Sequence, residues 1–221
     1  MKIQSIHLKH ILHFADLKVD FSYHDKPVTL ILGDQASGKT SILRFSYQAL
    51  TWFAARYKDL RSAGVVMLDH DIMLNRLQSK IDIQVAVPAE LYALKPTAAD
   101  TATEPYTWQL YKTLNQQGIG ISRVETLELE QLVNLYQQAT LQDPLQGLPL
   151  IAYYPAERFV NEMNILSKNN PLIFQHAHAY EISAIPYTTF ARFFEWFREI
   201  SDIENAQTAQ FLQTILHQPK S

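Results

Sequence analysis

The first third of the chain carries two hydrophobic patterns, one of period two and one of the α-helical period. Residues 2–8 and 17–21 alternate apolar and polar side chains, which predicts two half-buried strands. Residues 27–32 form a continuous apolar run, which is typical of a strand buried on both faces. From 41 to 60, apolar residues recur at helical spacing and predict a helix of about five turns. This order of elements indicates an α/β fold.

The rest of the chain favours further strands with helices between and after them. Residues 80–87 alternate strictly between apolar and polar side chains, and residues 115–118 form a polar turn between two strand-like segments. Residues 149–154 form a second apolar run. Strands are therefore predicted at 80–87, 106–114, 118–124 and 149–154, and helices at 125–141 and from residue 186 onward.

Composition narrows the class of protein. A chain of 221 residues with 47% hydrophobic and 19% charged residues buries a sizeable core. The net charge of −3 excludes a broadly basic nucleic-acid-binding coat, although not a local basic patch. The absence of Cys excludes disulfides, a thiol nucleophile and thiolate metal sites. Because no apolar run is long enough to span a membrane and the N-terminus lacks the apolar core of a signal peptide, a soluble cytoplasmic protein is expected.

One motif carries specific chemistry. Residues 33–40 fit G-x-x-x-x-G-K-[ST] at every fixed position, between the apolar run and the helix. The backbone N–H groups of such a loop and the positive end of the helix bind phosphates. Lys39 would reach the β- and γ-phosphates of ATP as the catalytic lysine, and the Thr40 hydroxyl would ligate Mg²⁺. The expected nucleotide-binding residues are Gly33, Asp34, Gln35, Ala36, Ser37, Gly38, Lys39, Thr40 and Ser41.

Ala36 occupies a position of this loop where Gly is common. A left-handed backbone at Ala would cost about 1 kcal/mol, which predicts a lower affinity for nucleotide without loss of the site.

The layout resembles the ATP-binding-cassette ATPase heads of the SMC-like and RecF-like group. Their N-termini have a short strand, an Asn-Phe-like turn, a second strand and then the phosphate-loop strand; here MKIQSIHLKHILHFADLKVDF precedes VTLILGDQASGKTSIL, with His13 and Phe14 at the turn. The chain departs from the group at Gln35 and Ala36, where Asn-Gly is usual. The resemblance implies a P-loop NTPase fold, an ABC-ATPase-like mixed sheet with an antiparallel accessory lobe and a C-terminal helical segment. These parts would occupy residues 1–60, 61–148 and 149–221 of a single partial ATPase head.

Two later segments, IAYYPAER at 151–158 and FFEWFREISDIEN at 193–205, resemble a bacterial subfamily described as predicted ATP-binding protein involved in virulence. These proteins are ATPase heads of the overlapping-nuclease and anti-phage type. The resemblance places Arg158 at the Q-loop position, where it contacts the γ-phosphate or a partner, or else forms a surface salt bridge. Lys9, His10 and His13 lie where related heads contact the adenine or the α-phosphate, and a surface role is the alternative.

The resembled heads also need a Ser-Gly-Gly signature and an apolar strand that ends in Asp-Glu, the Walker B strand. No glycine follows Gly147, and no such strand follows residue 154. The chain would thus be the N-terminal part of a head, truncated or one half of a split ATPase, that hydrolyses ATP only when these elements are supplied. A role in DNA repair or anti-phage defence is implied.

The partners implied are a C-terminal ATPase half or second head, a homodimer, and a nuclease or other effector; nucleic acid is neither indicated nor excluded by charge. Without its other half, the strand at 28–32 would keep an unpaired edge, so self-association is expected.

Other interpretations remain open at this point. The run Val65 to Asp71 has the apolar residues and the Asp of a Walker B strand, so Asp69 or Asp71 would hold Mg²⁺ in a complete small phosphotransferase; the alternative is a turn before the next strand. A non-catalytic nucleotide-binding module that docks a partner through the aromatic residues 190–197 is a third interpretation. His176 and His178 suit a metal, but surface histidines fit their spacing better.

Overall fold

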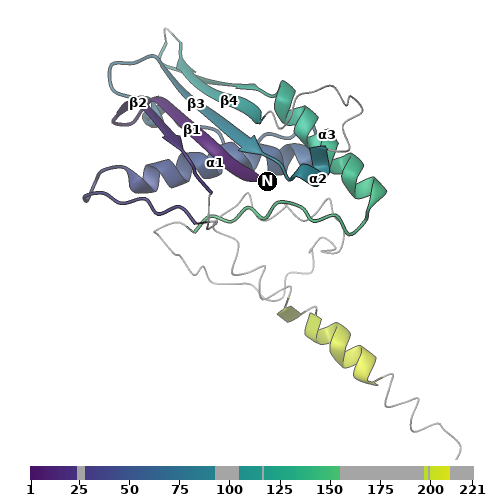
Figure 1. The fold of residues 1–221 in the computed structure, drawn as a ribbon. Coiled ribbons are helices and arrows are strands. Elements are labelled where there is room, and N and C mark those ends of the chain that lie inside the picture. Colours follow the sequence, from purple (N-terminus) through teal and green to yellow (C-terminus); the bar gives the residue numbers. More distant parts are fainter. Residues whose placement is uncertain (24–27, 93–104, 116, 155–196, 199, 210–221) are drawn as a thin grey trace, which may run out of the picture.

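The computed structural model describes residues 1–23, 28–92, 105–115, 117–154, 197–198 and 200–209. These residues form a mixed α/β fold whose sheet is antiparallel, with strand order β2-β1-β3-β4-β5 (Figure 1). The elements are β1 (Lys2–Ile11), β2 (Phe14–Asp20), α1 (Lys39–Lys58), the 3-10 turn η1 (Asp69–Asp71), β3 (Gln78–Ala86), α2 (Ala89–Tyr92), β4 (Tyr106–Leu114), β5 (Gly120–Glu125) and α3 (Leu127–Gln142).

β1 lies between β2 and β3 in the sheet. It pairs with β2 across a tight turn and with β3, more than sixty positions later in sequence. Ile6 faces Val19 on one side and Ile83 on the other, so apolar residues of three strands share one face. This register confirms the alternation predicted at 2–8, 17–21 and 80–87.

The apolar face of the sheet packs against α1 and α3. Trp108 of β4 is 1% exposed, and its indole N–H donates to the carbonyl of Ala49 in α1 over 3.0 Å. Phe53 of α1 meets Tyr136 of α3 edge to face, with ring centroids 5.4 Å apart. The helix after the phosphate loop is therefore fixed to the sheet through its buried side.

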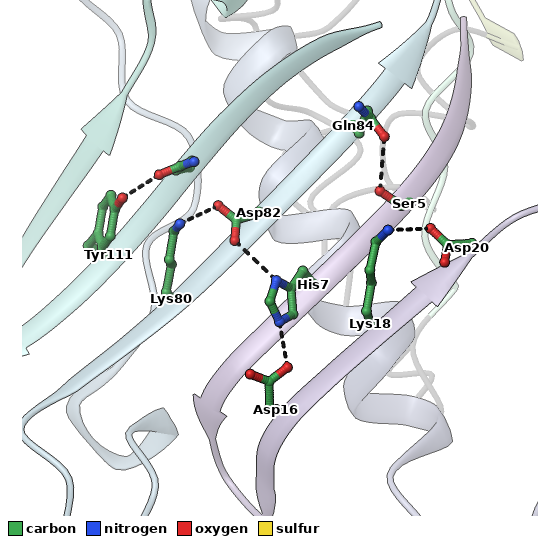
Figure 2. A network of polar contacts seen from close by, with 10 residues as sticks. Ser5, His7, Asp16, Lys18, Asp20, Lys80, Asp82, Gln84 and Tyr111 are labelled. Carbon is green, nitrogen blue, oxygen red and sulfur yellow. Dashed lines mark hydrogen bonds and ion pairs between the residues drawn. The ribbon is translucent and has the colours of Figure 1, made fainter.

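The opposite face of the sheet is polar and carries a cross-strand network (Figure 2). His7 of β1 lies between two carboxylates: its Nε2 is 2.7 Å from Asp16 of β2, and its Nδ1 is 3.5 Å from Asp82 of β3. Lys80 lies 2.8 Å from the other oxygen of Asp82. The hydrogen bond from His7 lowers the pKa of Asp16. One face of the sheet thus packs into the core, and the other carries a network of polar and charged side chains.

Two predicted strands are absent, and both predictions were wrong. Residues 28–32 and 149–154 run as extended chain without strand pairing. Leu30 and Leu150, expected to be buried, are 77% and 95% exposed. An apolar run becomes a buried strand only where neighbouring strands accept it, and the described part of the chain places none beside these segments. From residue 186 onward, the described residues 197–198 and 200–209 are helical, as predicted.

Candidate nucleotide-binding site

The N-terminus of α1 lacks the groups that usually complete a helix start. Gly38 precedes the helix, no side chain caps it, and no acidic residue lies in the first turn. By contrast, α3 carries Glu128 and Glu130 in its first turn. Because the first N–H groups of a helix have no partners within it and its start carries partial positive charge, the start of α1 is suited to an anion.

The loop before α1 closes around the Lys39 ammonium. Its Nζ donates to the carbonyl oxygens of Gly33 at 2.8 Å and Asp34 at 2.5 Å, and lies 3.3 Å from the Ser37 hydroxyl. The N–H of Ser37 donates to the Asp34 carbonyl over 3.2 Å. Residues 33–37 and Thr40 are exposed, so phosphates can approach the loop from solvent.

Two residues of the loop adopt left-handed backbone. Ala36 has φ 64°, the conformation that the sequence analysis identified as unfavourable for Ala, and Gly38 has φ 92°. A side chain at Gly38 would also collide with its surroundings: a Cβ there would lie 2.3 Å from Cζ of Phe14 and 2.6 Å from Nε2 of His13. Gly38 is therefore required both by its backbone angle and by its neighbours.

That close approach comes from the β1–β2 turn, which forms a wall beside the loop. The rings of His13 and Phe14 lie with centroids 4.0 Å apart, against Gly38. The structure thus brings His13 to the phosphate loop. Lys9 instead lies in register with Asp16 and Lys80, on the polar face of the sheet.

The proposed Walker B carboxylates have other partners. Residues 65–68 form no strand, and Asp69–Asp71 form a 3-10 turn, as the alternative interpretation predicted. The Asp69 carboxylate lies 2.9 Å from Nζ of Lys112, and this hydrogen bond lowers the pKa of Asp69. Asp71 is fully buried and accepts from Nη2 of Arg44 at 2.5 Å. Each carboxylate is therefore neutralised by a cation of the chain itself.

The sequence analysis missed two contacts of α1. One is the ion pair of Arg44 with Asp71; the other is the stacking of Tyr47 on Tyr153, with centroids 4.8 Å apart and planes at 20°. Neither periodicity nor a motif in the sequence distinguishes Arg44 from the other charged residues of α1 or identifies its partner.

Several predicted residues lie outside the described part of the chain. They are Arg158, His176, His178 and the aromatic residues 190–196. In the part of the chain that the structure covers, no three His, Asp or Glu side chains gather where they could hold a metal ion. No helix of that part is long and apolar enough to cross a membrane.

Two curated proteins are similar to this chain. It is 25% identical over 220 residues to the retron Ec83 probable ATPase of Escherichia coli, which covers 95% of this chain and 36% of that protein. It is 23% identical over 214 residues to the retron Vc95 probable ATPase of Vibrio cholerae serotype O1 biovar El Tor, covering 93% and 38%. The chain thus spans about a third of the length of these relatives.

Solved structures and a family model also match. One structure comes from a study of ATP-driven dimerization and DNA-stimulated activation of SMC ATPases, with a TM-score of 0.35, 14% identity, and coverage of 61% of this chain and 79% of that chain. Another is an SMC head bound to the C-terminal winged-helix domain of ScpA, with a TM-score of 0.36, 14% identity, and coverage of 63% and 41%. The family model described as an AAA domain matches residues 5–216. The chain belongs to the AAA domain family.

Proposed function

We propose that this chain binds ATP with Mg²⁺ at the phosphate loop and forms the N-terminal part of an SMC/RecF-like ATPase head. The observation that carries the proposal is the uncapped start of α1 beside a loop that is closed around the Lys39 ammonium. Phosphates would replace the carbonyl partners of Lys39 and accept from the loop N–H groups. Residues 33–41 would hold the nucleotide, with His13 beside it.

The exposed Thr40 hydroxyl suits a Mg²⁺ ligand, and the bound ion would neutralise charge on the β- and γ-phosphates. Asp69 is held by Lys112 and Asp71 by Arg44, so neither is the carboxylate that we propose for a hydrolytic site. We therefore place hydrolysis in an assembly with a C-terminal ATPase half or a second head. In this proposal, residues 1–60 supply the phosphate loop and first helix, residues 61–148 the accessory lobe, and residues 149–221 the C-terminal helical segment of the partial head.

The retron relatives support a role of the whole protein in anti-phage defence, in which a nuclease or other effector would respond to the ATP cycle. Arg158 would then contact the γ-phosphate or the partner. The small net charge of −3 gives no support to extensive contacts with nucleic acid.

Titration with a fluorescent ATP analogue carrying a methylanthraniloyl group, in the presence of Mg²⁺, tests the proposal. Lys39→Ala should weaken binding at least about a hundredfold, because the charge on the β- and γ-phosphates loses its counter-ion. Lys18→Ala makes the same change of charge on the polar sheet face, where Lys18 lies 3.0 Å from Asp20, and should leave binding unchanged. Equal affinity of wild type and Lys39→Ala would exclude the proposed site.

Turnover separates the proposed function from a complete phosphotransferase. The chain alone should show no ATPase activity, because Asp69 and Asp71, the two candidate carboxylates for Mg²⁺, are already paired with Lys112 and Arg44. Hydrolysis that Asp69→Asn or Asp71→Asn abolishes would contradict this part of the proposal.

A further inference from the structure

Three segments of the molecule meet at the buried residue Asp71, two through its carboxylate and one through its backbone carbonyl. Its carboxylate accepts from Nη2 of Arg44 in α1 at 2.5 Å and from the N–H of Leu68 at 2.8 Å. Its backbone carbonyl accepts from the N–H of Leu12, in the β1–β2 turn, over 2.8 Å. One fully buried residue thus connects the phosphate-loop helix, the turn and the segment that precedes β3.

The β1–β2 turn depends on this connection because its backbone is strained. His10 and Leu12 have φ 52° and φ 49°, and a left-handed backbone costs a non-glycine residue about 1–2 kcal/mol. The turn is held by the Leu12 bond to Asp71 and by the N–H of Met73, which donates to the His10 carbonyl over 2.9 Å. The segment 71–73 therefore supports the strained end of the β1–β2 hairpin with two backbone hydrogen bonds.

The same turn places the His13 and Phe14 rings against Gly38. Arg44 lies five residues after Lys39 on α1, about 7.5 Å along the helix axis. The path from Gly38 along α1 to Arg44, across to Asp71 and through Leu12 to His13 returns to Gly38. This closed path fixes the distance between the β1–β2 turn, with its His13 and Phe14 rings, and the N-terminus of α1.

We infer that Arg44 and Asp71 are positioning residues of the nucleotide site: their ion pair holds the β1–β2 turn against Gly38 and so keeps the phosphate loop in its binding conformation. The inference rests on the proposed function, since it concerns the same loop. Neither side chain needs to touch the nucleotide. A buried ion pair contributes little net stability because desolvation of both charges offsets their attraction, so its defined geometry is the larger contribution.

The adjacent ion pair of Asp69 with Lys112 provides a matched control. Asp69 lies two residues earlier in the same 3-10 turn, but its carboxylate points to β4, 2.9 Å from Nζ of Lys112. Asp69→Asn and Asp71→Asn therefore make the same chemical change in the same turn, and only the second acts on the connection to α1 and the β1–β2 turn.

The experiment measures binding of the methylanthraniloyl ATP analogue with Mg²⁺, well below the melting temperature of each variant. Asp71→Asn and Arg44→Gln should each weaken binding about tenfold, whereas Asp69→Asn should leave it unchanged. Arg44→Lys keeps the positive charge and should recover part of the lost affinity. Because Arg44 is partly exposed, its variants provide the test if Asp71→Asn does not fold.

Amide hydrogen exchange supplies a second measurement. In Arg44→Gln, the Leu12 amide should exchange faster, while the amides of β4 keep their protection. Unchanged affinity in both Arg44→Gln and Asp71→Asn, or an equal loss in Asp69→Asn, would overturn the inference. Absence of binding by the wild-type chain would instead exclude the proposed function, so the two failures are distinguishable.

Discussion

The two halves of this molecule differ in how far their backbone is paired. In the sheet half, each of the five strands has a strand neighbour, and Ile6, Ile83 and Trp108 are at most 1% exposed. In the phosphate-loop half, residues 28–32 and 149–154 belong to no strand of the sheet. Figure 1 shows both segments as extended chain rather than strand arrows.

These two segments nevertheless have the side-chain pattern of strands. Ile31 packs against the core, while its neighbours Leu30 and Leu32 are 77% and 80% exposed. Ile151 is 6% exposed and Leu150 is 95% exposed. One side of each segment is thus anchored on the core and the other presents apolar side chains to solvent. We call the exposed apolar side chains of residues 28–32 and of residues 149–154 the apolar stripe; neither segment is a strand in the structure.

The two halves differ in the sequence separation between a strand and the neighbours that it needs. Some strand pairs of the sheet are local, since short turns join β1 to β2 and β4 to β5, although β1 also pairs with β3 more than sixty positions later. A buried strand of a parallel sheet takes its neighbours from distant parts of the sequence. The strands of the sheet thus have their neighbours among the described residues, whereas segments 28–32 and 149–154 belong to no strand there.

The largest effect should come from the core of the sheet half. Trp108→Ala removes a side chain that is 1% exposed and bonded to Ala49, and should lower the free energy of unfolding by about 3–5 kcal/mol. Leu30→Ala in the apolar stripe should change it by less than about 0.5 kcal/mol, because that side chain is already in solvent. Urea denaturation followed by circular dichroism measures both.

Similar losses in the two variants would contradict the division into a paired and an unpaired half. Trp108→Phe separates the causes, since it keeps most of the ring and removes only the N–H bond to Ala49.

The second prediction concerns association. The exposed apolar stripe should cause the isolated chain to self-associate, and Leu30→Lys combined with Leu150→Lys should reduce this, because charge opposes pairing at an open edge. Leu145→Lys is the control: Leu145 is 91% exposed but lies outside the stripe. Light scattering at tens of micromolar compares the three proteins, and a monodisperse wild-type monomer would refute the prediction.

The third prediction concerns alkaline pH and the contact that anchors residues 149–154 to α1. Burial, with a smaller contribution from Tyr153, raises the pKa of Tyr47 from 10.0 to about 12. A pKa raised in the folded state means that its stabilisation is complete below pH 10.0 and is lost as the pH rises towards about 12. The melting temperature should therefore fall across this interval.

Tyr47→Phe should remove this component of the pH dependence, since the variant has no phenol to ionise at that position. Tyr154→Phe is the control, because Tyr154 is 80% exposed and should behave like the wild type. An alkaline fall that is unchanged in Tyr47→Phe would show that other groups cause it.

The sheet half could be predicted from the sequence because its signals are local. Period-two alternation identified β1, β2 and β3, the polar turn at 115–118 identified the β4–β5 hairpin, and helical spacing identified α1 and α3 to within a few residues. The phosphate loop could be predicted too, including the backbone at Ala36, since the motif fixes loop geometry.

What failed depends on distant partners. The apolar run at 28–32 shows which residues suit a buried strand, but it carries no information on whether a neighbour is present. The pairing of Arg44 with Asp71 joins residues 27 positions apart through a 3-10 turn, and no periodicity specifies it. Sequence patterns therefore locate elements and motifs, whereas the contacts between them need the structure.

The smallest effect should come from Ala36, where the loop itself can be improved. Ala36 has φ 64°, and its left-handed backbone costs about 1 kcal/mol. Ala36→Gly removes this strain but adds about 0.5–1 kcal/mol of backbone entropy to the unfolded chain, so the net stability should hardly change. Nucleotide affinity should rise by at most about fivefold, equivalent to ~1 kcal/mol, to the extent that the empty loop leaves the strained conformation.

Gln35→Gly controls for flexibility alone, because Gln35 is not among the residues with positive φ, and glycine there relieves no strain. The methylanthraniloyl ATP titration should show tighter binding for Ala36→Gly and equal or weaker binding for Gln35→Gly. Equal gains in both variants would show that general loop flexibility, rather than the angle at Ala36, limits the affinity. A loss in Ala36→Gly would show that Ala36 supports the loop in the unpaired half by restricting its motion.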